Sequence, residues 1–205
     1  MHEINNLLIT KFPGTEHRYV SYDETIDQSK QAEHEDFLHS LEPPSLPPHE
    51  LILKVNSPIV LLRNLNPKEG LCYGTRLICL GFAPNVIHAL IAVRNHIEKQ
   101  VFIPKISLQC SDSNIYIVPF KKTQLSVRLC FAMTINKAQG QTLDFVGLYL
   151  KEPVFGHGQL YVALSRAKTA NDVRVLVKPS LDEQTDTVST RNIVYDEVLS
   201  IAGVI

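Results

Sequence analysis

The chain has 205 residues, of which 44% are hydrophobic and 20% charged, and its formal net charge is −1. This length suffices for one ordinary domain or two small ones, and the composition excludes a wholly disordered chain. No apolar run approaches the roughly 18 residues of a membrane-spanning helix, and no secretory signal opens the sequence, so we expect no membrane partner.

Charge is distributed unevenly along the chain. Residues 1–50 carry a net charge of −7 and residues 169–205 one of −3, whereas residues 51–120 and 121–168 carry +4 and +5. A basic middle between acidic ends suits a surface that faces a polyanion, although solvated surface charge is the commoner cause of such a bias.

The acidic N-terminal segment ends in a proline-rich connector. Residues 24–41 are polar and predict a helical or partly ordered stretch. Four of the six residues from Pro43 to Pro48 are prolines, which neither continue a helix nor fit a central strand. We therefore expect a stiff, extended connector, with a domain boundary between residues 48 and 49.

Short apolar runs follow the connector at near-regular spacing, separated by turn signals such as Asn56-Ser57-Pro58. The predicted strands span residues 51–55, 59–62, 76–80, 86–93, 100–103 and 115–118. Many short strands in this arrangement indicate a small β-barrel over residues 49–120.

The last part of the chain predicts a parallel β-sheet. Residues 125–131 alternate like a strand, and residues 145–150 form an apolar run that we expect to be buried on both faces. Residues 157–168 predict a helix and residues 173–177 a further strand. Strand, helix and strand at this spacing form a βαβ unit, whose strands pair in parallel.

Arg166 lies at the edge of the buried face of this predicted helix. Helical periodicity places Leu160, Leu164 and Ala167 on one buried stripe, and Arg166 roughly 100° away from it. An arginine there can reach across an interface, or it can be an exposed side chain that the helix dipole favours near the C-terminus. Spacing alone leaves both interpretations open.

A polar loop from Thr134 to Thr142 connects two of the predicted strands. At the carboxyl end of a strand in an α/β sheet, such a loop can hold phosphates through backbone N–H groups and the ammonium group of Lys137. It can also be a polar connection that binds nothing.

Cysteines and histidines give no metal-binding pattern. Cys72, Cys79, Cys110 and Cys130 are at least seven positions apart, whereas structural zinc sites use closely spaced pairs, so we expect reduced and mostly buried thiols. His34 and His39 are five positions apart, which places them on different sides of a helix, so we expect surface histidines and no metal site.

Two segments resemble helicase motifs V and VI. The first runs from Phe131-Ala132-Met133 through Thr142, and the second from Gly156-His157-Gly158 through Ala167. Together they resemble the petite-integration-frequency (PIF) family of ATP-dependent DNA helicases in superfamily one, with the nearest likeness to its Helitron-like branch. The resemblance extends to residues 19–23, 46–51, 61–65, 70–77 and 192–199, and so covers almost the whole chain.

This resemblance implies the α/β class and an ATP site between two RecA-like domains. The chain is expected to be the second of these, a parallel sheet with flanking helices, carrying an inserted small SH3-like β-barrel. Residues 1–48 would form the first part of that domain with the connector, residues 49–120 the barrel, and residues 121–205 the remainder with both motifs. Asn56, Tyr73 and Arg94-Asn95-His96 depart from the family in turns of the barrel.

The resemblance also implies roles for individual residues. Arg166 is expected to be catalytic, as an arginine finger that reaches the γ-phosphate. The implied ATP-binding residues are Gln139, Gly140, Gln159 and Tyr161. The implied DNA-binding residues are Thr134, Asn136 and Lys137. Ala138 stands where many relatives have Ser, which removes one hydroxyl from the loop.

The sequence contains no P-loop, the motif G-x-x-x-x-G-K-[ST] that cradles the phosphates in this mechanism. None of its nine glycines is followed by Lys. We therefore expect ATP and Mg²⁺ to be bound mainly by an upstream first RecA-like domain, and these 205 residues to be inactive alone. The stretch 18–24 imitates a Walker-B strand, but we expect it to belong to the sheet of the second domain.

The resulting hypothesis is the C-terminal portion of an ATP-dependent 5′–3′ DNA helicase, acting on single-stranded DNA and DNA junctions in repair, recombination, telomere maintenance or transposition. One alternative is a non-enzymatic nucleic-acid-binding remnant without a P-loop domain, which the basic middle of the chain favours. Another is a barrel that binds other proteins. Lys121-Lys122 is too short for a nuclear localisation cluster, so nuclear residence is expected from the helicase role alone.

Overall fold

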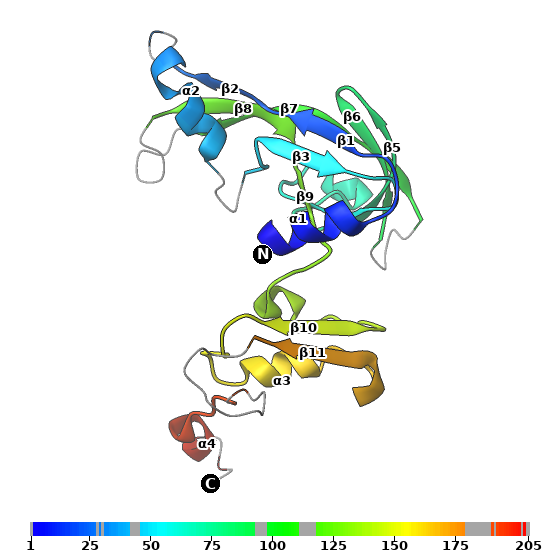
Figure 1. Cartoon of the computed structure of the whole chain (residues 1–205), viewed down its shortest axis with the longest axis vertical. Helices are drawn as coiled ribbons and strands as arrows, with labels where there is room; N and C mark the ends of the chain where they lie inside the picture. The colour runs from blue at the N-terminus through cyan, green and yellow to red at the C-terminus, as the bar shows by residue number, and fades with distance from the viewer. Residues whose placement is uncertain are drawn as a thin grey trace. The chain divides into compact units, whose positions relative to one another are not determined.

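The computed structural model describes residues 2–27, 29, 31–41, 46–92, 98–110, 118–178, 190, 192–201 and 203. It has a mixed α/β fold and divides into two units, Met1–Ala132 and Met133–Ile205 (Figure 1). This division differs from the predicted boundaries at 48/49 and 120/121, because strands on both sides of those boundaries pair with one another.

The first unit is built mainly of antiparallel strands. Its elements are α1 (His2–Lys11), β1 (His17–Val20), β2 (Tyr22–Thr25), α2 (Gln31–Ser40), β3 (Glu50–Leu53), β4 (Pro58–Leu61), η2 (Pro67–Glu69), β5 (Arg76–Ala83), β6 (Val86–Ile91), β7 (Gln100–Cys110), β8 (Phe120–Leu125) and β9 (Val127–Leu129). Among the described residues, one sheet has the order β2-β8-β7-β6-β5-β4-β9, and β1 pairs with β3 in a second sheet.

The long sheet bends at Ser126, the single residue between β8 and β9. Before Ser126 the chain pairs with β7, and after it the chain pairs with β4, two strands that β5 and β6 separate in the sheet. The predicted strands at 51–55, 59–62, 76–80, 86–93 and 100–103 correspond to β3, β4, β5, β6 and the first part of β7. The described strands form a strongly curved sheet, in which β8 continues through Ser126 into β9, and no closed barrel is seen among them. The SH3-like barrel stays a prediction.

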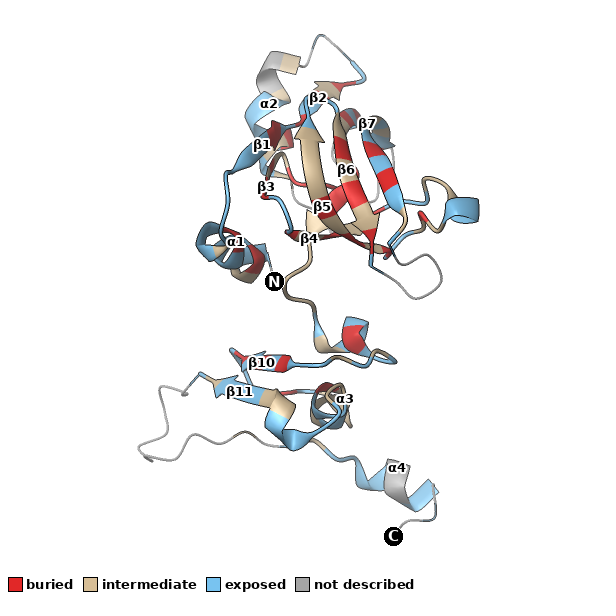
Figure 2. Cartoon of the chain, turned by 90° about the vertical axis from the view of Figure 1, so that its right-hand side faces the viewer, coloured by how far each residue is buried: buried red, intermediate tan, exposed pale blue. Residues whose placement is uncertain are grey.

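Alternating burial along the strands forms the main core of this unit. Figure 2 shows the buried residues of β5, β6 and β7 alternating with less buried ones along each strand. The buried side chains include Leu53, Ile59, Leu61, Leu77, Ile87, Ile91, Ile103 and Leu125. A second, smaller cluster of Leu38, Leu46, Cys110 and Phe120 attaches α2 to the sheet.

The second unit contains the predicted βαβ arrangement. Its elements are η4 (Ile135–Ala138), β10 (Val146–Leu150), α3 (Gln159–Leu164), η5 (Ala170–Asp172), β11 (Val173–Val177) and α4 (Asp196–Ile201). β10 and β11 pair in parallel, with Val146 opposite Val173 and Leu150 opposite Val177. The parallel pairing inferred from the sequence is therefore confirmed.

Two details of this unit differ from the prediction. β10 is buried on one face only, because Leu148 and Leu150 pack with Ala163 of α3 while Tyr149 is exposed. The helix ends at Leu164, four residues earlier than predicted, so Ala167 lies outside it. Within the helix Ala163 is buried and Leu164 is 41% exposed, which corrects the predicted stripe.

Residues 18–24 were expected in the sheet of the second RecA-like domain, but they pair with neither β10 nor β11. They form β1 and β2, which pair antiparallel with β3 and β8 of the first unit. Helix α2 is shorter than the predicted stretch 24–41, because the first residues of that stretch belong to β2. The first prolines of the connector, the predicted strand residues 115–117 and the turn 94–96 lie outside the described residues.

Among the described helices, none has the length and hydrophobicity needed to cross a membrane. The four cysteines, all among the described residues, form no disulfide with one another; Cys79 and Cys110 are buried, and Cys72 and Cys130 are partly exposed.

Replacement of Ile59 by Ala tests the importance of β4. Ile59 is fully buried, and its strand pairs on one side with β5 and on the other with β9. We expect Ile59→Ala to lower the free energy of unfolding by about 2–5 kcal/mol, because it leaves a cavity in the core. Val60→Ala, on the opposite face of the same strand, is the control and should cost about 1 kcal/mol or less. Equal losses in urea titrations would contradict this assignment of the core.

Cys79 should make stability fall at alkaline pH. Burial raises the pKa of its thiol from 9.0 to about 12. Between these pH values the unfolded thiol loses its proton while the folded one keeps it, so rising pH favours the unfolded chain. Between pH 9 and 10, we expect the free energy of unfolding to fall less steeply with pH in Cys79→Ala than in the wild type. The difference in slope should be up to about 1.4 kcal/mol per pH unit. Identical slopes for wild type and variant would contradict this.

Candidate functional site

The loop predicted to contact nucleotide and DNA begins with a single 3₁₀ turn. Thr134 precedes η4, and its carbonyl oxygen accepts hydrogen bonds from the backbone N–H groups of Lys137 and Ala138, at N···O distances of 3.1 and 3.2 Å. Gly140 has φ +77°, in the left-handed region that glycine adopts without strain. The turn and this glycine bend the chain ahead of β10.

Exposure separates the residues of this loop into two faces. Ala138 is buried, and Ile135 packs against the hydrophobic cluster below α3. The five residues predicted to contact ligands are all exposed, namely Thr134, Asn136, Lys137, Gln139 and Gly140. The loop therefore presents an ammonium, amides and a hydroxyl to solvent from a fixed apolar base. Because the side chain of Ala138 points into that base, the missing Ser hydroxyl leaves this exposed face unchanged.

Arg166 lies just beyond α3 and contacts the same loop. Its Nε donates to the carbonyl oxygen of Val162 at 2.7 Å, and its Nη1 donates to that of Gln141 at 3.0 Å. Its Nη2 donates to Oγ of Ser165 at 2.8 Å. In this conformation the guanidinium group joins the end of α3 to the loop. Gln141 and Ser165 were not predicted as partners of Arg166: Gln141 contacts it through a backbone carbonyl, which every residue has, and Ser165 through its side-chain hydroxyl.

The remaining predicted nucleotide-binding residues lie at the start of α3. Oε1 of Gln159 accepts hydrogen bonds from the backbone N–H groups of Phe155 and Gly156, at 3.1 and 3.3 Å. Gln159 therefore holds the turn that precedes the helix. Tyr161 is 73% exposed and is available to a ligand or another domain. His157 is fixed from the C-terminal side, because its Nδ1 accepts a hydrogen bond from the N–H of Tyr195 at 2.8 Å.

An ion pair joins the far side of the loop to the end of α3. Nζ of Lys168 lies 2.6 Å from Oδ1 of Asp144, and both side chains are exposed. The hydrogen bond between them lowers the pKa of Asp144 and raises that of Lys168. Since water screens such a pair, we assign it little stabilising effect.

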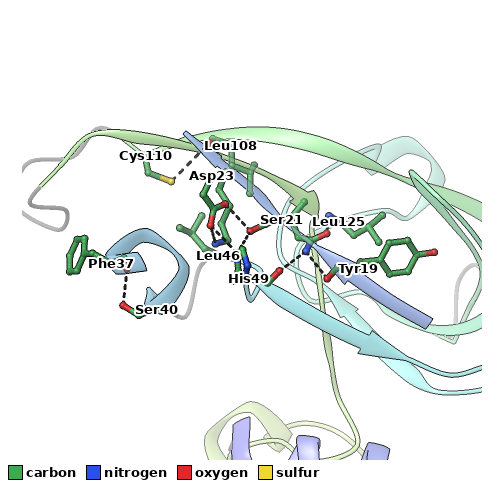
Figure 3. A network of polar contacts seen from close by, with 12 residues as sticks. Tyr19, Ser21, Asp23, Phe37, Ser40, Leu46, His49, Leu108, Cys110 and Leu125 are labelled. Carbon is green, nitrogen blue, oxygen red and sulfur yellow. Dashed lines mark hydrogen bonds and ion pairs between the residues drawn. The ribbon is translucent and has the colours of Figure 1, made fainter. Parts of the chain in front are cut away.

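The first unit contains a second group of polar side chains, which the sequence did not predict. Oδ2 of Asp23 lies 2.8 Å from Nζ of Lys122, and both side chains are fully buried. Oγ of Ser21 lies 2.8 Å from Oδ1 of Asp23 and 2.9 Å from Nδ1 of His49. Figure 3 shows Ser21, Asp23 and His49 pointing toward one another. The ring of His39 stacks on that of His49, so His39 is packed and is not the free surface residue that we expected.

This group does not have the geometry of a nucleophilic triad. Ser21 and Asp23 both contact the same nitrogen of His49, Nδ1, at 2.9 and 3.3 Å. A serine nucleophile needs one imidazole nitrogen for its own proton and the other for the carboxylate. The arrangement thus gives no path for activating Ser21.

The same group resembles a metal site only in composition. Asp23, His39 and His49 each have a possible ligand atom, and these atoms lie within 4.8 Å of one another. The ammonium of Lys122, however, already neutralises Asp23, and the two imidazole rings are stacked, with centroids 3.9 Å apart. The lone pairs of stacked rings lie in nearly parallel planes and do not converge on one ion. We interpret the group as a buried structural ion pair.

Comparison with known proteins identifies relatives of both units. Residues 36–82 match the family model described as the 2B domain of the DNA helicase Pif1. The chain is 31% identical over 175 residues to the human ATP-dependent DNA helicase PIF1, a match that covers 84% of this chain and 25% of the human protein. It is 46% identical over 59 residues to the ATP-dependent DNA helicase RRM3 of Saccharomyces cerevisiae, covering 29% of this chain and 8% of that protein. It thus spans about a quarter or less of these relatives.

Solved structures of Pif1 helicases share the fold. The Bacteroides Pif1 bound to single-stranded DNA has a TM-score of 0.68 at 20% identity, and the match covers 98% of this chain and 42% of that one. The Candida albicans Pif1 has a TM-score of 0.59 at 23% identity, covering 85% and 42%. At these identities the likeness is one of fold. With the family model and the curated relatives, it shows that the chain belongs to the Pif1 family of DNA helicases, with residues 36–82 matching its 2B domain.

Proposed function

We propose that this chain supplies the motif V and motif VI surface of an ATP-dependent 5′–3′ DNA helicase, which couples ATP hydrolysis to movement along single-stranded DNA and to duplex unwinding. Curated relatives are named ATP-dependent DNA helicases. Among proteins of the same fold, one is described in complex with ADP-AlF3 and single-stranded DNA. These descriptions of related proteins support the proposal through homology.

The observation that carries the proposal is the contact between Arg166 and the loop that bears Lys137. Nη1 of Arg166 lies 3.0 Å from the carbonyl oxygen of Gln141, four residues beyond Lys137. One end of this surface therefore offers a guanidinium group suited to phosphate, and the other an exposed ammonium suited to the DNA backbone. In the proposed roles, Gln139, Gly140, Gln159 and Tyr161 face ATP, while Thr134, Asn136 and Lys137 face DNA.

The proposal requires a P-loop domain that these 205 residues do not contain. We assign Mg²⁺ and most of the phosphate contacts to that domain, and Arg166 to the γ-phosphate across the cleft. The second unit would then be part of a RecA-like domain. Its parallel pair β10–β11 supports this role, because parallel sheets are normally covered on both faces and here Tyr149 and Leu176 are exposed on the face away from α3.

We assign the bent sheet of the first unit to the SH3-like barrel of the 2B domain, with the match over residues 36–82 in support. The helicase role suggests DNA junctions as further substrates, residence in the nucleus, and work in repair, recombination, telomere maintenance or transposition. These details follow from the proposed helicase role and depend on the same experiments that test it.

A second candidate function is nucleic-acid binding without ATP hydrolysis. The net charge of +9 over residues 51–168 favours it independently of the motifs. Under this alternative the chain binds single-stranded DNA, but Arg166 has no effect on any ATPase.

Lys137→Ala tests the DNA contact in the chain as it is. If Lys137 contacts a phosphate, its loss should lower the slope of log affinity against log salt by about 0.7 for single strands. Fluorescence anisotropy with a labelled oligothymidine measures the slope. Titrations between about 50 and 200 mM salt suffice, because affinity that depends on phosphate contacts falls strongly over this range. Lys178→Ala removes another exposed lysine of the same unit and serves as the control. An unchanged slope for Lys137→Ala would remove the loop from the DNA surface.

Arg166→Ala tests the catalytic role and separates the two functions. With the chain joined to the P-loop domain of a Pif1-type helicase, we expect the substitution to lower the kcat of ATP hydrolysis by about 10³–10⁵, the usual effect of an arginine finger. Arg174→Ala, the loss of another exposed arginine of the same unit, should leave hydrolysis within about twofold. Phosphate release by the joined protein gives the rates. Equal rates for wild type and Arg166→Ala would favour the non-enzymatic alternative.

A further inference from the structure

Almost every N–H of the Arg166 guanidinium group is engaged within the chain. Nε donates to Val162, Nη2 to Ser165, and Nη1 to the carbonyl oxygens of both Gln141 and Ala138, at 3.0 and 3.5 Å. A guanidinium group has five N–H bonds, so these four contacts leave one. A phosphate bound in two-pronged fashion needs two. Arg166 therefore cannot bind a phosphate in that way without releasing one of these partners.

The main chain repeats the connection made by the side chain. The N–H of Leu143 donates to the carbonyl oxygen of Arg166 at 2.9 Å, and Leu143 forms an isolated parallel bridge with Ala167. Within the loop, the N–H of Gln141 donates to the carbonyl oxygen of Ala138 at 3.1 Å. Residues 138–143, here called the clamped loop, are thus held against the end of α3 at two places, on either side of Thr142.

Loss of the guanidinium contacts would loosen this loop selectively. The contacts are charge-assisted, which makes them stronger than ordinary backbone hydrogen bonds. Without them the carbonyl groups of Ala138 and Gln141 lose a cationic partner, and Gly140 between them adds backbone freedom. β10 and β11 would be unaffected, since their ladder and the packing of Leu148 and Leu150 do not involve Arg166.

We propose that Arg166 is a positioning residue for the clamped loop, and that nucleotide phosphate and the loop carbonyls compete for its guanidinium group. The part that concerns phosphate rests on the proposed function. Arrival of a γ-phosphate would then free the loop that follows Lys137, which gives nucleotide binding a direct mechanical connection to the DNA-facing side chains. Departure of the phosphate would let the guanidinium group return to the carbonyls.

Hydrogen exchange of the purified chain, without nucleotide or DNA, tests the clamp. In Arg166→Ala we expect the amides of Gln141 and Leu143 to exchange on the order of tenfold faster, as the loss of one charge-assisted hydrogen bond implies. Millimolar guanidinium chloride should restore their protection, whereas sodium chloride at the same ionic strength should not. Arg166→Lys keeps the charge but not the planar fork, so its effect should be intermediate.

Lys168→Ala is the matched control. It removes a neighbouring cation whose partner is the exposed Asp144, and it should leave the clamped loop unchanged. Unaltered exchange in Arg166→Ala, or equal acceleration in Lys168→Ala, would overturn the clamp. So would a loss of protection in β10 and β11 in both Arg166 variants, because Arg166 would then support the whole unit. As no ATP is involved, a failed helicase assignment leaves this measurement interpretable.

Discussion

The fold of the first unit depends on the buried ion pair between Lys122 and Asp23. Both side chains are fully buried, and Nζ lies 2.8 Å from Oδ2. Removal of one partner would leave an uncompensated charge in the interior, at a cost of roughly 3–5 kcal/mol. The pair fixes β2 on β8. Asp23 in turn orients Ser21 and His49 (Figure 3). His39 of α2 stacks on His49. The carboxylate of Asp23 thus connects the edge strand β2 with His49, which precedes β3, and through His49 with α2.

The sequence could predict the parts of the fold that local pattern determines. Short apolar runs between turn signals located β4, β5 and β6, and the spacing of strand, helix and strand located the parallel pair β10–β11. Contacts between distant residues were beyond such reasoning. No partner could be predicted for Lys122, because nothing near it in the chain shows that Asp23, 99 positions away, meets it in the interior. The pairing of β9 with β4 also joins residues far apart in the chain, as do the antiparallel pairings of β1 with β3 and of β2 with β8.

The roles of the candidate site residues stay predictions, but the exposure of the loop follows from its sequence pattern. Each loop residue assigned to a ligand by resemblance is exposed, and Ala138, the departure from the family, is buried. A short polar loop between two strands has few ways to turn, so the pattern largely determines which residues point outward. The partners of Arg166 could not be foreseen, because three of them are backbone carbonyls and a carbonyl has no sequence signature.

Those carbonyl contacts also explain why the position requires arginine whatever its ligand. Two interpretations were open from sequence, an exposed side chain favoured by the helix dipole and a group that reaches across an interface. Neither included contacts between the guanidinium group and the loop of its own chain. In the structure the guanidinium group instead donates to four acceptors, on Val162, Ala138, Gln141 and Ser165. A lysine ammonium has three N–H bonds around a single nitrogen and cannot span acceptors on both the helix and the loop. The chemistry that suits arginine to phosphate therefore also suits it to hold this loop.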